Sequence, residues 1–156
     1  MKKCQEIGID GITTIASDLA TITVNFVAKK MGLPGNTIEC NIKSTNKYEM
    51  RKAFEENGVS TIKFQKIKSL NDIEKLKNMK YPLIVKPTDR SGSRSITKVT
   101  DESKLKNAIS SAIESSFKKE AIVEEFIEGI EYSAEGITFN GQHNFLAITK
   151  KETTGA

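Results

Sequence analysis

The sequence predicts an α/β protein of the α+β type, whose central part is two helices packed on one face of a sheet of about four strands. Three observations lead to this prediction. Residues 60–127 alternate strand-like and helix-like segments in the order β-α-β-β-α-β. Asn140-Gly141 separates two alternating runs, the strongest short-range signal of a β-hairpin. Residues 11–31 look like the last strand and helix of a parallel sheet.

The first part of the chain, residues 1–58, contains the end of that parallel-sheet domain and linking helices. Gly11–Ala16 is a β-prone run, and Ser17 is the expected N-cap of the helix that follows. Asn46 is expected to open a further helix, with Glu49 at the capping-box position and Gly58 just past its end. On that helix Lys47 and Arg51 are four residues apart and therefore share one face.

The second part, residues 59–127, is predicted to be a compact layered subdomain. One helix is expected to be capped by Asn71 and the other to start near Asp101, with its apolar residues on one stripe. The expected strands are 61–67, 81–86, 96–100 and 121–127. The third part, residues 128–156, is the predicted hairpin, which starts another antiparallel sheet.

Length and composition exclude several classes of protein. The 156 residues permit one sizeable core, and no run of about 18 apolar residues or signal-peptide h-region occurs, so we expect no membrane span and no secretion. Cys4 and Cys40 are far apart, and His143 is the single histidine, so the sequence predicts free thiols, no zinc site and a cytoplasmic protein. His143, in the second hairpin strand, is expected to face solvent.

A nucleic-acid-binding domain is one possible reading of the net charge of +4. The basic residues are almost all lysine, however, and they are interleaved with acids rather than gathered in a stripe. The chain has no Trp, and its arginines are Arg51, Arg90 and Arg94. It therefore has few side chains that could stack on bases or read base edges through a guanidinium. We therefore rank this hypothesis last and expect no nucleic-acid partner.

The stretch Tyr81–Val99 has the parts of a phosphate-binding loop. Lys86 ends a strand, and a loop rich in Gly and Ser follows it at residues 88–95. A lysine supplies a point charge and the backbone N–H groups of such a loop supply donors, which is how phosphates are bound. Neither a Walker A motif nor G-x-G-x-x-G is present. Taken alone, the loop is more simply explained as a mobile solvated hairpin.

The stretch Ile122–Phe139 is rich in glutamate. Alternation along the expected strand places Glu131 and Glu135 on one face. A charged solvent face explains this about as well as a site does, although carboxylates also accept ribose hydroxyls or hold a divalent cation.

The ordered set of Lys47, Lys86 before the Gly/Ser loop, Glu124–Ile127 and Glu131 resembles the ATP-grasp superfamily. That superfamily includes biotin carboxylase, carbamoyl phosphate synthetase, glycinamide ribonucleotide synthetase, D-alanine:D-alanine ligase and amino-acid ligases. The resemblance covers nearly the whole chain. It implies that residues 1–58 end the pre-ATP-grasp domain, that 59–127 form the ATP-grasp lid, and that 128–156 start the C-terminal ATP-grasp subdomain.

The resemblance implies phosphate contacts for five residues. Lys47 would be the first lysine to reach phosphate from outside the lid, and Lys86 would bridge the adenine side and the α-phosphate. Ser91, Gly92 and Ser93 would lie in the flap that closes over the β- and γ-phosphates.

It implies nucleoside contacts for four more. Glu124, Glu125 and Ile127 would form the hinge that accepts the adenine amino group and offers backbone groups to the ring edge, and Glu131 would take the ribose hydroxyls. Two departures from the family pattern weaken the expected flap geometry more than the assignment: Ser95 stands where many relatives have a further glycine, and Asn46 where many have an acid.

The function implied by the resemblance is that of an ATP-dependent carboxylate-amine ligase, which activates a small carboxylate as an acyl phosphate for attack by an amine. Its cofactors would be ATP and Mg²⁺, with the metal-binding acids on strands beyond Ala156. The tail Ile148–Ala156 resembles the start of the substrate loop of the amino-acid ligases, so we expect this chain alone to be inactive. The alternative is a non-catalytic nucleotide-binding or regulatory module that keeps the lid and lacks the metal strands.

Overall fold

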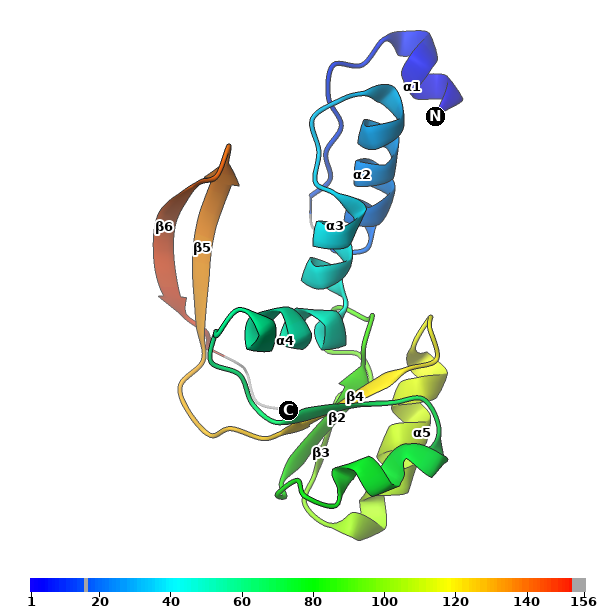
Figure 1. Cartoon of the computed structure of the whole chain (residues 1–156), viewed down its shortest axis with the longest axis vertical. Coiled ribbons are helices and arrows are strands. Elements are labelled where there is room, and N and C mark those ends of the chain that lie inside the picture. The colour runs from blue at the N-terminus through cyan, green and yellow to red at the C-terminus, as the bar shows by residue number, and fades with distance from the viewer. Residues whose placement is uncertain (16, 153–156) are drawn as a thin grey trace. The chain divides into compact units, whose positions relative to one another are not determined.

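The computed structural model describes residues 1–15 and 17–152 and divides the chain into two compact units (Figure 1). The first unit is residues 1–126 and the second begins at Ile127. Within the described part of the chain, none of the helices has the length and hydropathy needed to cross a bilayer.

The first unit opens with four helices. They are α1 (Lys2–Ile7), α2 (Ala20–Met31), α3 (Ile38–Thr45) and α4 (Lys47–Glu56). The predicted opening of α4 is confirmed, because the Asn46 side chain accepts hydrogen bonds from the backbone N–H groups of Tyr48 and Glu49. Helices α1 and α3 were not predicted, although Thr37 caps α3 by accepting a hydrogen bond from the Cys40 backbone N–H at 3.1 Å.

The prediction of a strand at Gly11–Ala16 is wrong for residues 11–15, which form no strand, and Ala16 lies outside the described residues. A β-prone run needs a partner strand to satisfy its backbone groups. No described strand pairs with this segment. The prediction that Ser17 is the N-cap of the next helix is also wrong, because the N-cap of α2 is Leu19. The Ser17 Oγ nevertheless accepts a hydrogen bond from the Ala20 N–H at 3.3 Å.

The predicted four-stranded sheet is confirmed. Its strands are β1 (Phe64–Ile67), β2 (Leu83–Pro87), β3 (Thr97–Val99) and β4 (Ala121–Glu125), in the order β1-β4-β2-β3, with each neighbouring pair antiparallel. Two helical segments connect them: the 3₁₀ helix η1 (Leu70–Leu76), and η2 (Glu102–Lys104) leading into α5 (Leu105–Ser115).

The first connecting helix differs from the prediction in its type and its cap. It is a 3₁₀ helix whose N-cap is Ser69, and Asn71 lies inside its first turn. Ser69 and Asp72 form a capping box, in which the Asp72 carboxylate accepts hydrogen bonds from the backbone N–H groups of Lys68 and Ser69. Because Asp72 satisfies two donors at once, the N-cap lies two residues before Asn71.

The two faces of the sheet carry different residues, and one of them forms the hydrophobic core. Side chains alternate along each strand, so Leu83 and Val85 of β2 and Val123 of β4 point to the face that α5 and η1 cover. These residues and Ile109 of α5, all nearly fully buried, form the core. The opposite face carries the residues between them.

Helix α4 packs on that opposite face through β1. The rings of Tyr48 and Phe64 meet edge to face with centroids 5.6 Å apart, and the Lys66 ammonium lies 4.2 Å from the Tyr48 centroid. These contacts fix the start of α4 over the end of the sheet where the candidate residues lie.

The second unit is the predicted hairpin, which is confirmed. Strands β5 (Tyr132–Phe139) and β6 (Gln142–Lys150) pair antiparallel and are joined by Asn140 and Gly141. Both loop residues have positive φ, 49° and 75°, as a tight turn that matches strand twist requires. A register shift between Glu135 and Gly136 interrupts the pairing.

Candidate functional site

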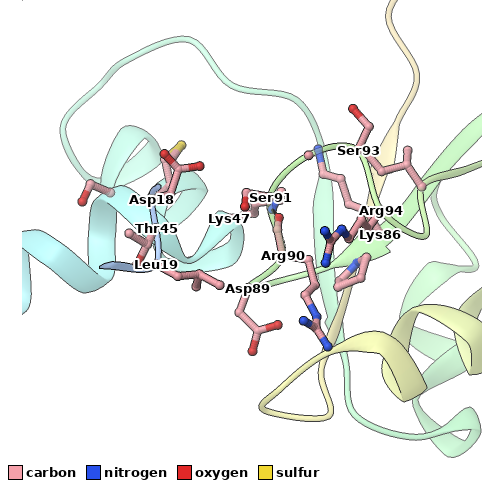
Figure 2. Close-up of a pocket in the computed structure, with 15 residues that line it drawn as sticks. Asp18, Leu19, Thr45, Lys47, Lys86, Asp89, Arg90, Ser91, Ser93 and Arg94 are labelled. Carbon is pink, nitrogen blue, oxygen red and sulfur yellow. Dashed lines mark hydrogen bonds between the residues drawn. The ribbon is translucent and has the colours of Figure 1, made fainter. Parts of the chain in front are cut away.

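The residues of the predicted phosphate loop line a cavity of about 300 Å³ in the first unit (Figure 2). Its wall comes from the start of α2, the α3–α4 junction, the end of β2 and the flap, which we define as residues 91–95. The residues of the wall that carry charge or belong to the flap are Asp18, Lys47, Lys86, Asp89, Arg90, Ser91, Gly92, Ser93 and Arg94. The cavity thus brings together Lys47, Lys86 and the predicted flap residues.

Lys47 is the first residue of α4, and its ammonium donates a hydrogen bond to the backbone carbonyl of Arg90 at the root of the flap (Figure 2). Its pKa is lowered below the usual value of 10.5, first by burial and then by the positive charge of Lys86. Asp89 and Asp18 act against this shift. A lysine that is costly to keep charged gains from an incoming anion, so Lys47 is suited to bind phosphate.

The flap has a backbone that favours glycine. Gly92 has φ of 70°, and Ser93 and Ser95 also take the left-handed conformation, with φ of 55° and 53°. Ser95, where many relatives were expected to have glycine, therefore adopts the conformation that glycine would take. Its Oγ lies 2.6 Å from that of Ser115, which ties this end of the flap to α5.

The root of the flap is also attached to the end of α5, which the sequence did not reveal. The Asp89 carboxylate accepts hydrogen bonds from the backbone N–H groups of Phe117 and Lys118 at 3.1 and 2.8 Å. The Arg90 Nε donates to the Ser115 carbonyl at 2.5 Å, and its guanidinium lies 3.6 Å from the centroid of the Phe117 ring. These contacts join segments more than twenty residues apart, so no local sequence pattern signals them.

A buried carboxylate lies behind the cavity. The register of β2 and β4 pairs Ile84 with Glu124, which places Glu124 on the same face as Lys86. The Lys86 Nζ is 2.5 Å from Glu124 Oε2, and Arg51 Nε donates to Glu124 Oε1 at 2.7 Å. The Glu124 side chain is 4% exposed.

The charge state of Glu124 follows from two opposed effects. Burial by itself raises the pKa of its carboxyl group, but hydrogen bonds and positive charge from Arg51 and Lys86 outweigh burial and hold the pKa below its usual value. Glu124 is therefore an ionised, doubly paired carboxylate. Arg51 was not among the predicted site residues, although its position four residues after Lys47 had placed it on the same helix face.

Glu125 does not join this group. It pairs in register with Leu83, which belongs to the core face, so its side chain leaves the sheet on the side opposite Glu124. Its carboxylate accepts a hydrogen bond from the Lys80 backbone N–H at 3.0 Å and lies 3.7 Å from the Lys63 ammonium. The structure thus separates two carboxylates that are adjacent in sequence.

Ile127 and Glu131 belong to the second unit, where both side chains are exposed. Glu131 directly precedes β5, and its carboxylate accepts a hydrogen bond from the Lys151 ammonium at 2.6 Å. His143 is exposed as predicted, and its Nδ1 lies 2.7 Å from Thr138 Oγ1.

Mg²⁺ prefers carboxylate and other oxygen ligands. Within residues 1–15 and 17–152, no three carboxylate, imidazole or thiol side chains gather closely enough to hold a metal ion.

This chain is similar in sequence and in fold to known proteins. Residues 79–156 match the model of the ATP-grasp domain family. The chain is 29% identical to alanine–anticapsin ligase of Bacillus subtilis (strain 168) over 97% of its own length, and 30% identical to a D-alanine–D-alanine ligase of Sulfurimonas denitrificans over 93%. It spans 37% and 39% of those two relatives.

Among solved structures, L-amino acid ligase from Bacillus licheniformis superposes with a TM-score of 0.81 and 24% identity, over 99% of this chain and 36% of that one. This likeness establishes the fold, a mixture of helices and antiparallel sheets. The family match covers half of the chain, and it shows that the chain belongs to the ATP-grasp family.

Proposed function

We propose that this chain is the ATP-binding portion of an ATP-dependent carboxylate-amine ligase. The observation that carries the proposal is the cavity in which Lys47, Lys86 and the flap meet, with the ionised Glu124 behind it. Two ammonium groups and the backbone of a Gly/Ser flap form a surface complementary to a polyphosphate.

The phosphate contacts follow from this arrangement. Lys47 gives up its hydrogen bond to the Arg90 carbonyl and binds a phosphate oxygen, while Lys86, held by Glu124, contacts the α-phosphate and the adenine side. Ser91, Gly92 and Ser93 cover the β- and γ-phosphates. Positive charge placed before the reaction stabilises the charge that develops during phosphoryl transfer, and a closed flap excludes water that would hydrolyse an acyl phosphate.

The proposed nucleoside contacts rest on the resemblance to the ATP-grasp family. We propose that Glu124 accepts the adenine amino group, that Ile127 offers backbone groups to the ring edge, and that Glu131 exchanges Lys151 for the ribose hydroxyls. Glu125 contributes through its backbone, since its carboxylate is directed to the other face of the sheet.

The reaction forms a C–N bond. The γ-phosphoryl group passes to a small carboxylate, and an amine then displaces phosphate from the acyl phosphate to give an amide. The names of the relatives mention alanine, anticapsin and amino acids, so we propose an amino acid as the carboxylate substrate. Mg²⁺ neutralises phosphate charge in this chemistry, and we propose that its protein ligands come from segments outside this chain.

The division of the chain is part of the proposal. Residues 1–58 are the end of the pre-ATP-grasp domain with its linking helices, 59–127 the lid, and 128–156 the start of the C-terminal subdomain, in a cytoplasmic protein. We propose that the 156 residues alone bind nucleotide weakly and catalyse no ligation.

The test uses a longer protein that also contains the remaining strands of the ATP-grasp fold. Lys86→Ala should reduce ATP-dependent phosphate release more than tenfold, about 1.4 kcal/mol of transition-state stabilisation. Lys80→Ala, which removes a lysine from the neighbouring loop, is the control and should leave the rate near that of the unchanged protein. An unchanged rate in Lys86→Ala removes Lys86 from the site.

A non-catalytic nucleotide-binding or regulatory module is the second candidate, because the cavity lined by Lys47, Lys86 and the flap would also serve a protein that only binds nucleotide. The two candidates differ in a single measurement. If the natural full-length protein binds ADP and ATP but hydrolyses neither, with or without amino acids, it is a binding module.

A further inference from the structure

Arg51 lies one helical turn after Lys47, on the face of α4 that looks onto the sheet. Its Nε donates to Glu124 Oε1 at 2.7 Å, and its side chain is 27% exposed. The residues that line the cavity include Lys47 and Lys86 but, in the described chain, not Arg51. Glu124 is not among the lining residues either, so Arg51 is linked to the cavity through Glu124 and then Lys86 rather than directly.

The two oxygens of Glu124 have different partners. Lys86 binds Oε2 and Arg51 binds Oε1. An ionised carboxylate has about four lone-pair positions, so each oxygen keeps capacity for another donor. Because a planar guanidinium holds one oxygen, the Glu124 carboxylate keeps one orientation. Lys86 pairs with the other oxygen and also lines the cavity.

Removing Arg51 would release the orientation of the carboxylate. A lysine ammonium is a compact, rotatable point charge, and it can approach either oxygen of an unrestrained carboxylate. Lys86 would then be the single cation beside a carboxylate only 4% exposed, and it would not hold that carboxylate in one orientation.

We propose that Arg51 is a positioning residue for base recognition, which holds the Glu124 carboxylate so that its free lone pairs face the exocyclic amine of an adenine base. This inference rests on the proposed function, because it presumes that the cavity binds an adenine nucleotide. Arg51 touches neither base nor phosphate in this role. Its effect must therefore depend on the base and on Glu124.

The experiment measures binding of three probes, ATP, GTP and inorganic tripolyphosphate, by amide chemical-shift titration of the 156-residue chain. Arg51→Met should weaken ATP binding by at least about tenfold and reduce the preference for ATP over GTP, while tripolyphosphate binding changes less than about threefold. The matched control is Lys52→Met on the same helix, whose ammonium pairs with Glu56 at 3.5 Å. It should change none of the three.

A double-mutant cycle separates positioning from general stabilisation. In a Glu124→Gln background, Arg51→Met should cause no further loss of ATP affinity, because the group through which Arg51 acts is already altered. Arg51→Lys keeps the charge but not the planar donor and should be intermediate in base preference, and it serves if Arg51→Met does not fold.

Three results overturn the inference. Equal losses for ATP and tripolyphosphate would make Arg51 a phosphate ligand, additive losses in the Glu124→Gln background would make it independent of Glu124, and unchanged ATP binding would give it no part in recognition. If the unsubstituted chain binds neither ATP nor tripolyphosphate, the proposed function fails first, and the role of Arg51 fails with it.

Discussion

The backbone N–H of Lys47 donates a hydrogen bond to the carbonyl of Thr88 at 2.8 Å. Thr88 is fully buried, and it follows Lys86 by two residues at the end of β2. The first turn of α4 is thus attached by its main chain to the strand that carries the other lysine of the cavity. The backbone segments that carry the two lysines are therefore held together by a main-chain hydrogen bond and not by side-chain contacts alone.

Lys47 should take up a proton when nucleotide binds at alkaline pH. Burial, and then the charge of Lys86, lower its pKa in the free protein, whereas phosphate favours the charged form. ATP affinity should therefore fall as pH rises through the lowered pKa toward 10.5. Calorimetry in two buffers of different ionisation enthalpy measures the protons taken up. Lys47→Met should abolish this uptake, and persistence of the uptake in that variant would assign it to another group.

The same shift fixes the sign of the effect of Lys47 on folding. Between the lowered pKa and 10.5 the unfolded chain binds more protons at this lysine than the folded chain does. The contribution of Lys47 to stability should rise with pH through this window. Urea unfolding of the free protein and of Lys47→Met at several alkaline pH values checks the sign, because the substitution should flatten the rise.

Glu124→Gln should destabilise the first unit by about 3 kcal/mol, because it leaves Arg51 and Lys86 beside a buried group that no longer carries a charge. Urea denaturation gives the free energy of unfolding. Glu49→Gln is the matched control, since Glu49 is 34% exposed and lies 3.6 Å from the Lys66 ammonium. It should cost less than about 1 kcal/mol, and equal costs for the two substitutions would contradict this ranking.

Ser95 should respond differently to alanine and to glycine. Ser95→Ala loses the contact with the Ser115 hydroxyl and keeps the left-handed backbone, for a cost of about 1 kcal/mol. Ser95→Gly loses the same contact but removes a conformational cost of about 1 kcal/mol, so it should be close to neutral. Thermal unfolding of the two variants compares them directly. A glycine variant less stable than the alanine variant would show that flexibility of the flap outweighs its backbone strain.

Asp72 should stabilise the first unit at pH values above its acid range. Hydrogen bonds from Lys75 and from the Lys68 backbone lower its pKa from 3.8 to about 2. Its contribution is therefore present above 3.8 and is lost as pH falls through about 2. Melting temperatures across this range should converge for the unsubstituted chain and Asp72→Asn. Glu74→Gln, the same charge change in the same helix, should show no such convergence.

Local signals in the sequence predicted most of the fold. The caps at Asn46 and Asp101 and the turn at Asn140-Gly141 act within a few residues, so they could be read directly. The β-prone run at residues 11–15 led to a wrong prediction. A strand needs a partner strand, and the β-propensity of a segment does not show whether one is present.

The contacts of the site were less accessible to sequence analysis. Arg51 and Glu124 are 73 residues apart, and their pairing depends on the antiparallel placement of β4 and on the packing of α4. Alternation along the predicted strand 121–127 already separates Glu124 from Glu125, but which of them faces α4 depends on the register and the packing of the sheet. The resemblance to a family supplied residue types in order, whereas the position of each side chain required the sheet.

The central position of β4 limits how this site can change during evolution. Glu124 is carried by a strand that is hydrogen-bonded on one side to β1 and on the other to β2. A backbone shift that moved its carboxylate would have to break hydrogen bonds to both neighbouring strands. Evolution therefore cannot easily change the position of Glu124 by moving this strand. New nucleotide preferences should instead arise by substitution on α4, where a surface helix tolerates exchange, and Arg51 would be among the first positions to vary.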